Sequence, residues 1–124
     1  MIARHYKDLV CWQLANEVKK KVYAITARKH IARDFEFCQQ IRESARSAPS
    51  NIAEGFGRYR PADFARFSEY ARGSLAETQN HLNDALDLGY IDADECSSVC
   101  RLAVRAEKAT VKLILYLKGP GRNH

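Results

Sequence analysis

The sequence predicts an all-α fold, an antiparallel up-down-up-down four-helix bundle that occupies residues 1–124 as a single domain. Four segments repeat their apolar residues every three or four positions, as one face of a helix requires. No segment shows the sustained apolar and polar alternation of a half-buried strand. The segments are joined by short connections, which favour antiparallel neighbours.

The first helix is expected from Tyr6 to Arg28, and the second is expected to begin near Asp34. Each carries one apolar stripe with steps of three and four, which indicates a single buried face. The stripes are Cys11, Ala15, Val18, Val22 and Ile25 in the first helix, and Cys38, Ile41, Ala45, Ala48 and Ile52 in the second.

Pro49 lies inside the second expected helix, among small residues. It lacks an N–H, and its ring crowds the carbonyl group four residues earlier, on Ala45. We therefore expect the helix to bend or break at Pro49. Gly55 and Gly57 follow, and their conformational freedom predicts the end of the helix.

The third helix is expected to begin at Pro61, a favourable first-turn residue, and to end in a Schellman turn at Gly89. The fourth is expected to start after Asp92, because Glu95 three residues later resembles a capping box, and to end at Gly119-Pro120-Gly121. Their stripes are Phe64, Phe67, Ala71, Leu75, Leu82 and Leu86, then Cys96, Val99, Ala103, Ala106, Thr110, Leu113 and Leu117.

The segment around Pro49 resembles the hallmark of the four helix bundle protein family, also called the 23S ribosomal RNA intervening-sequence protein family. The resemblance covers nearly the whole chain. It is carried by residues 47–55 (SAPSNIAEG), 9–12 (LVCW), 40–42 (QIR), 73–77 (GSLAE) and 88–91 (LGYI). The sequence departs from the family pattern at Ala48, where a larger aliphatic residue is usual, and in the first loop, which lacks a proline.

The resemblance implies a short antiparallel bundle, often assembled into a ring-shaped homopentamer, in small bacterial proteins of the cytosol. Some members are encoded inside insertions in large-subunit ribosomal RNA genes. The bundle is similar to accessory proteins of diversity-generating retroelements, which work with reverse transcriptases and nucleic acid. No enzymatic reaction is established for the family, so the resemblance implies neither an enzyme nor a cofactor.

The composition is that of a soluble protein with a net charge of +5. Residues 73–100 hold six acidic residues and no lysine or arginine, whereas both ends are basic, which indicates polarised surfaces. The start has no apolar signal segment, and the run LILYL is too short to span a bilayer. With four cysteines and no export signal, we expect free thiols and a location in the cytoplasm, not at a membrane.

The fourth helix carries a row of cations, here named the basic stripe, at steps of four, three and four: Arg101, Arg105, Lys108 and Lys112. Such a row could follow the phosphates of RNA or DNA. The alternative is an ordinary solvated helix face. The stripe has no interleaved aromatic residues, so any binding is expected to depend on shape and charge rather than on sequence.

Four polar residues near the expected kink form a second candidate site: Asn51, Glu54, Ser74 and Glu77. They could line a binding cleft. The favoured alternative is structural, with these side chains capping freed backbone groups and pairing with arginines such as Arg58, because buried polar groups are usually there to be satisfied.

No metal site or catalytic group is expected. Cys96 and Cys100 lack the second ligand pair of a zinc site, and Glu77 and His81 are four apart where di-iron bundles use three. Ribonucleases of the HEPN kind need an arginine five to seven residues before a histidine, and His81 has none at that distance.

The sequence thus favours a non-enzymatic homo-oligomer that contacts nucleic acid, with a structural or adaptor oligomer bound to another protein as the alternative. Self-association is expected because several apolar residues lie outside the stripes. These are Val10, Leu14, Tyr23, Phe56, Leu102 and Ile114.

Overall fold

The structure, a computed structural model, describes residues 3–119. All regular secondary structure within these residues is helical, and they contain no strand. The elements are a 3₁₀ turn η1 (Tyr6–Asp8) and the helices α1 (Val10–Thr26), α2 (Lys29–Ala32), α3 (Phe35–Phe56), α4 (Pro61–Asp87) and α5 (Ala93–Lys118). The all-α class is therefore confirmed.

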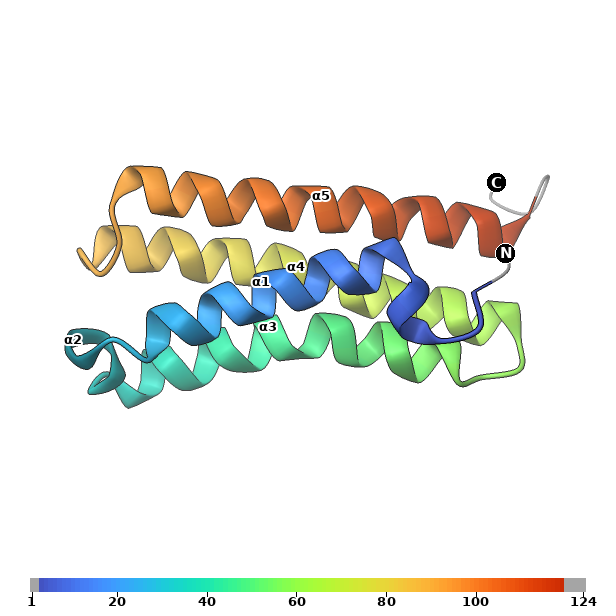
Figure 1. The fold of residues 1–124 in the computed structure, drawn as a ribbon, viewed down its shortest axis with the longest axis horizontal. Helices are drawn as coiled ribbons and strands as arrows, with labels where there is room; N and C mark the ends of the chain where they lie inside the picture. Colours follow the sequence, from blue (N-terminus) through green and yellow to red (C-terminus); the bar gives the residue numbers. More distant parts are fainter. Residues whose placement is uncertain (1–2, 120–124) are drawn as a thin grey trace.

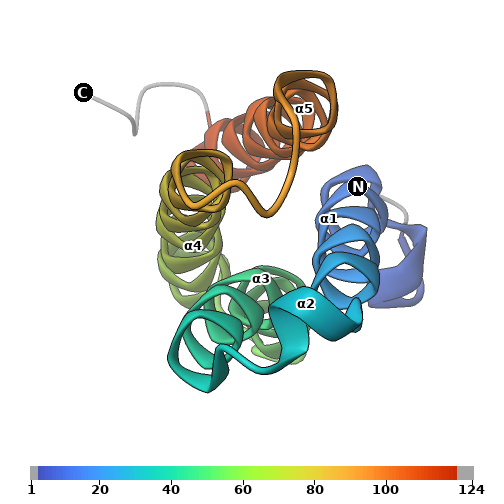
Figure 2. The ribbon, with the colours of Figure 1, turned by 90° about the vertical axis from the view of Figure 1, so that its left-hand side faces the viewer.

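The four long helices lie side by side, and each runs opposite to the long helix before it (Figure 1). Seen from one end, α1 and α4 occupy opposite corners, as do α3 and α5 (Figure 2). Each long helix packs against its two neighbours around this square. None of the helices within residues 3–119 has a stretch long and apolar enough to cross a lipid bilayer.

The core is made by the apolar stripes. Every stripe residue of α1 and α3 is buried, and Phe67, Leu86 and Leu117 are the half-buried members in α4 and α5. The largest side chains with almost no exposed surface come from α1, α2, α3 and α4 and are Val18, Val22, Ile25, Ile31, Ile41, Ile52, Leu75 and Leu82. Heptad-like spacing thus located the buried faces correctly.

The start of the first helix differs from the expectation. Tyr6–Asp8 form a 3₁₀ turn, Leu9 is extended with φ −77° and ψ 127°, and α1 begins only at Val10. The carboxylate of Asp8 accepts hydrogen bonds of 3.1 Å from the backbone N–H groups of residues 4 and 5. This local side-chain bonding competes with the helix, and the break turns Leu9 into the core.

The connection after α1, expected as a loop, contains the one-turn helix α2. Its Ile31 is fully buried, and the Ile31 carbonyl oxygen lies 3.3 Å from Sγ of Cys38 in α3. A single helical turn is too short to show an apolar period, so α2 could not be predicted from residue spacing.

Helix α3 passes through Pro49 without interruption. The placement of Pro49 within a helix is therefore confirmed, whereas a bend at this point stays a prediction. Pro49 itself is buried, as are Ala45 and Ala48 beside it. The missing N–H is tolerated in a helix whose face is packed into the bundle.

The role expected of Gly55 was wrong. Helix α3 continues to Phe56, so Gly55 lies inside the helix and does not end it. A Cβ atom at Gly55 would lie 2.8 Å from Cδ1 of Phe64 and 2.9 Å from Cβ of Phe67, both on α4. Position 55 has no room for a side chain, because the backbones of α3 and α4 approach each other closely there.

The turn after α4 is the expected Schellman motif. The N–H of Tyr90 donates to the carbonyl of Ala85 at 2.9 Å, and the N–H of Gly89 donates to that of Leu86 at 3.0 Å. Gly89 has φ +75°, which an L-residue adopts only under strain.

The capping of α5 agrees with the expectation in part. The Asp92 side chain accepts a 2.8 Å hydrogen bond from the backbone N–H of Glu95. The Glu95 side chain does not return this bond, because it pairs with both terminal nitrogens of Arg28 at 2.8 and 2.5 Å. Helix α5 ends before Gly119, which has φ 72°. The expected continuation of this stop at Pro120 and Gly121 lies outside the described residues.

Candidate functional site

The basic stripe lies on the outer side of α5. The four cations, Arg101, Arg105, Lys108 and Lys112, are all exposed, whereas Ala103, Ala106 and Thr110 on the opposite side of the helix have no exposed surface. The periodicity of an α-helix explains this division, since residues three and four apart share a face.

None of the four stripe cations forms an ion pair with a carboxylate of residues 3–119. Arg101 makes only a hydrogen bond of 3.2 Å, to the hydroxyl of Ser97. By contrast, four arginines outside the stripe do have a close acidic partner: Arg28, Arg58, Arg66 and Arg72. The stripe therefore keeps its positive charge available for an external anion.

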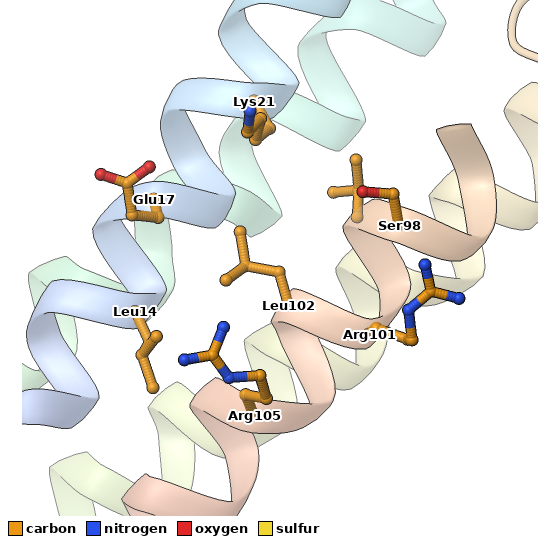
Figure 3. Close-up of a pocket in the computed structure, with 8 residues that line it drawn as sticks. Leu14, Glu17, Lys21, Ser98, Arg101, Leu102 and Arg105 are labelled. Atoms are coloured by element: carbon orange, nitrogen blue, oxygen red, sulfur yellow. The ribbon is translucent and has the colours of Figure 1, made fainter. Parts of the chain in front are cut away.

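A groove of about 510 Å³ runs between α1 and α5 beside the stripe (Figure 3). Leu14 of α1 and Leu102 of α5 are half-buried in it, and Arg105 extends from α5 toward α1. The remaining lining residues are Glu17, Lys21, Ser98, Val99 and Arg101. The groove thus combines an apolar floor with a mostly cationic rim.

A second groove, of about 300 Å³, lies between α4 and α5 and joins the stripe to α4. Lys108 and Arg72 both line it, together with Val104, Glu107 and Val111. The Glu107 carboxylate accepts a hydrogen bond from the side chain of Gln79. The cationic surface therefore extends from α5 onto α4. Residue spacing within one helix does not predict this, because Arg72 and Lys108 lie on different helices.

The polar residues near Pro49 are only partly brought together. The Asn51 amide donates to the carbonyl and to the hydroxyl of Ser47, both at 2.9 Å, and the Ser74 hydroxyl lies 2.9 Å from Oγ of Ser47. One turn away, the hydroxyls of Thr78 and Ser44 are 2.9 Å apart. These groups form a row of hydroxyls between α3 and α4 that satisfy one another.

The two carboxylates of the candidate cluster lie elsewhere. Glu54 pairs with Arg58, four residues later, at 3.0 Å. Glu77 is exposed, and its carboxylate lies 3.7 Å from Nε2 of His81, beyond hydrogen-bonding distance. Glu77 also lines a small polar groove of about 230 Å³ with Ser47. The arrangement supports the structural interpretation of the cluster, in which polar groups of adjacent helices partner one another.

The cysteines pack into the bundle. Burial raises the pKa of the Cys11 thiol to about 11, and burial followed by the adjacent Cys96 raises the pKa of Cys100 to about 11. A thiol in such surroundings stays protonated near neutral pH and is a poor nucleophile. Within residues 3–119 no three histidine, cysteine or carboxylate side chains lie together as metal ligands would.

The pair between Arg28 and Glu95 ties the end of α1 to the start of α5. The hydrogen bond from Arg28 is the main reason that the pKa of Glu95 is lowered. Sequence reasoning missed this pair, because the two residues are 67 positions apart and only the fold brings them together.

The fold and the candidate site define a small all-helical bundle protein whose charged side chains are sorted onto different faces. A family model described as 23S rRNA-intervening sequence protein matches residues 7–112, and the chain belongs to this family.

A crystal structure from Bacteroides thetaiotaomicron, determined at 1.70 Å, has a similar fold. That protein is described as one of unknown function from the S23 ribosomal protein family. The TM-score is 0.77 at 21% sequence identity, over 85% of this chain and 98% of that chain. No curated protein matches the chain.

Proposed function

We propose that the chain is a non-enzymatic bundle that assembles with copies of itself in the cytoplasm and contacts RNA or DNA through the basic stripe. The observation that carries the proposal is the row of four exposed cations that have no acidic partner within residues 3–119. Cations of such a row would displace the counterions condensed on the phosphates of a nucleic acid, which supplies affinity independent of sequence. The family membership agrees with this proposal.

Self-association is supported by apolar surface that one bundle leaves uncovered. Of the apolar residues outside the stripes, Ile114 is buried, Val10 is 61% exposed, and the other four are half-buried. Phe35, Leu88 and Leu115 add further exposed apolar area. We propose a ring of copies, with a pentamer as the expected size.

Light scattering at micromolar concentration tests the assembly. A pentamer would give about five times the chain mass of 14.1 kDa. A mass of one chain across the concentration range would contradict the proposed assembly.

Titrations of duplex RNA and duplex DNA over a range of salt concentrations test the nucleic-acid contact. Four phosphate contacts per chain predict a slope of log K against log salt near −3.6, at about −0.9 per contact. The double variant Arg105→Glu/Lys108→Glu should weaken binding to all sequences alike and flatten this slope by about two units. Exposed substitutions of this kind usually change the free energy of unfolding by less than about 0.5 kcal/mol, so the fold should survive.

The matched control is Lys20→Glu/Lys29→Glu, which makes the same change in net charge at exposed positions away from the stripe. It should lower binding less than the stripe variant. Equal losses for both double variants would show a response to net charge alone. If the wild type binds no nucleic acid at about 50 mM salt, where phosphate contacts are strong, the stripe has another purpose.

The second candidate function is a structural or adaptor oligomer with a protein partner. The groove between α1 and α5 favours it, because the half-buried Leu14 and Leu102 at its floor could receive an apolar side chain. Under this alternative, Leu102→Ser would abolish binding of the protein partner. Neither the wild type nor Arg105→Glu/Lys108→Glu would then bind nucleic acid in the titrations.

A further inference from the structure

The loop between α3 and α4 holds an aromatic ring out into solvent. Tyr59 has a relative exposure of 104% and lies between Arg58 and Arg60. Within residues 3–119 the side chains of Tyr59 and Arg60 have no hydrogen-bond, ion-pair or ring partner. The loop is short, and the N–H of Arg58 donates to the carbonyl of Gly55 at 3.0 Å on one side while Pro61 opens α4 on the other. The ring of Tyr59 is thus presented by an ordered turn.

The first turns of α4 continue this surface with alternating aromatic and arginine side chains. The guanidinium carbons of Arg58 and Arg66 lie 4.8 and 5.0 Å from the ring centroid of Phe67. The Phe67 and Tyr70 rings meet edge to face with centroids 5.7 Å apart, and Tyr70 is 49% exposed. Arginines stacked on rings present their planes and their N–H groups to solvent in a fixed direction.

The acidic residues nearby do not cancel this charge. Arg58 pairs with Glu54 at 3.0 Å and Arg66 with Asp63 at 3.4 Å, but both arginine side chains are about half exposed. Ion pairs at such exposure contribute little and exchange readily for other anions. Residues 58–72 hold four arginines and two acidic residues, so the segment remains cationic.

This surface lies on a different side of α4 from the basic stripe. Arg72 lines a groove with Lys108 of the stripe, but it follows Tyr70 by two residues and therefore lies on nearly the opposite side of α4. The stripe also runs along α5 toward the end of the bundle that carries the α3–α4 loop (Figure 1). The exposed rings and the stripe therefore approach the same end of the bundle on different faces.

We propose that this surface, here named the tip and defined as Arg58, Tyr59, Arg60, Arg66 and Tyr70, binds single-stranded nucleic acid. Unpaired bases stack on Tyr59 and Tyr70, and the arginines contact the flanking phosphates. Aromatic rings interleaved with cations are the combination by which proteins hold single strands without reading their sequence. The inference rests on the proposed function and adds the class of nucleic acid, because the stripe alone has no ring on which a base could stack.

Tyr59 is the residue that tests the tip most cleanly. Because its ring packs against none of residues 3–119, Tyr59→Ala removes a stacking platform without removing a packing contact among them. Base stacking on an aromatic side chain corresponds to a loss of about 5- to 150-fold in affinity when the ring is removed. Tyr59→Phe is the matched control, since it keeps the ring and removes only the hydroxyl.

The experiment measures fluorescence anisotropy of labelled uridine and thymidine oligomers and of a duplex of equal length, at one salt concentration. We expect wild type and Tyr59→Phe to bind the single strands alike, Tyr59→Ala to bind them at least fivefold more weakly, and all three to bind the duplex within about twofold. Tighter binding of the uridine oligomer would assign RNA as the ligand, and tighter binding of the thymidine oligomer would assign DNA. Ultraviolet crosslinking of an iodouridine oligomer should place the adduct on Tyr59 or Tyr70.

Each of the following results would overturn the inference. Tyr59→Ala could bind single strands as well as the wild type, or Tyr59→Phe could lose as much as Tyr59→Ala. A fall in assembly mass in Tyr59→Ala would make the ring a subunit contact instead. If the wild type binds the duplex through the stripe and no single strand, only the tip is refuted, whereas the absence of all binding refutes the proposed function as well.

Discussion

Replacing Gly55 by alanine should destabilise the bundle, although alanine is the better helix former. The added Cβ would lie 2.8 Å from Cδ1 of Phe64, 2.9 Å from Cβ of Phe67 and 3.3 Å from the backbone Cα of Phe64. Two of these neighbours are at or next to the backbone, so α4 itself must move. Overpacking costs about 1–3 kcal/mol, and the two contacts below 3.0 Å place Gly55→Ala in the upper part of this range, at about 2–3 kcal/mol. The intrinsic preference of a helix for alanine over glycine returns about 1 kcal/mol.

The expected net loss in the free energy of unfolding is therefore about 1–2 kcal/mol, with a fall in Tm of about 3–8 °C. Gly73→Ala provides the matched control on the same pair of helices. Gly73 lies inside α4, and a Cβ there would meet no atom within 4 Å. It should gain about 1 kcal/mol from helix propensity alone.

Both variants are compared with the wild type in urea titrations followed by circular dichroism, at one fixed protein concentration so that assembly affects all three alike. The reasoning would be refuted if Gly55→Ala were as stable as the wild type or more so. A loss of assembly mass in Gly73→Ala would place that glycine against a neighbouring copy.

Two further predictions concern polar pairs. Glu95→Gln removes the ion pair with Arg28, which lowers the pKa of Glu95 in the folded state, so the free energy of unfolding of the wild type should exceed that of the variant by about 0.5–1 kcal/mol at pH 7. This difference should be lost as the pH falls below the ordinary carboxyl pKa of 4.5, because Glu95 then becomes protonated. Urea titrations that show the same difference at pH 7 and pH 3 would contradict the prediction. Thr78→Val should cost about 1 kcal/mol, because it removes the buried hydroxyl that lies 2.9 Å from Oγ of Ser44 and leaves Ser44 with only its 3.1 Å hydrogen bond to the Ile41 carbonyl. The double variant with Ser44→Ala should cost less than the sum of the two single changes in a double-mutant cycle.

The long helices could be predicted because their burial follows from local spacing. Residues at steps of three and four, such as Val18 and Val22 in α1, share a helix face and became fully buried. The turn at Gly89 was also predictable, because the need for positive φ is a property of the residue itself.

Features that depend on contacts between helices were not predictable from spacing. Gly55 is explained by Phe64 on the next helix, and Glu95 turns away from its capping position because Arg28 lies nearby in space. The same holds for the candidate site: the exposure of the basic stripe followed from periodicity, whereas the approach of Arg72 to Lys108 required the packing of α4 against α5.

Tyr59 lacked any sequence signal for a different reason. The exposure of a tyrosine in a turn depends on the neighbouring helices, here the end of α3 at Phe56 and the start of α4 at Pro61. The residues Arg58, Tyr59 and Arg60 can be read from the sequence, but the exposure of the Tyr59 ring at the end of the bundle cannot.

The close approach of α3 and α4 at Gly55 bears on the order in which the chain acquires its structure. Their connection spans only the residues between Phe56 and Pro61, so bringing these helices together requires little loop-closure entropy. Helices α1 and α5 also pack together, yet their contacts join distant parts of the sequence. We therefore expect the α3–α4 hairpin to form early in folding and α1 and α5 to pack against it afterwards. Substitutions between α3 and α4, such as Gly55→Ala, should then change mainly the folding rate, and substitutions between α1 and α5 mainly the unfolding rate.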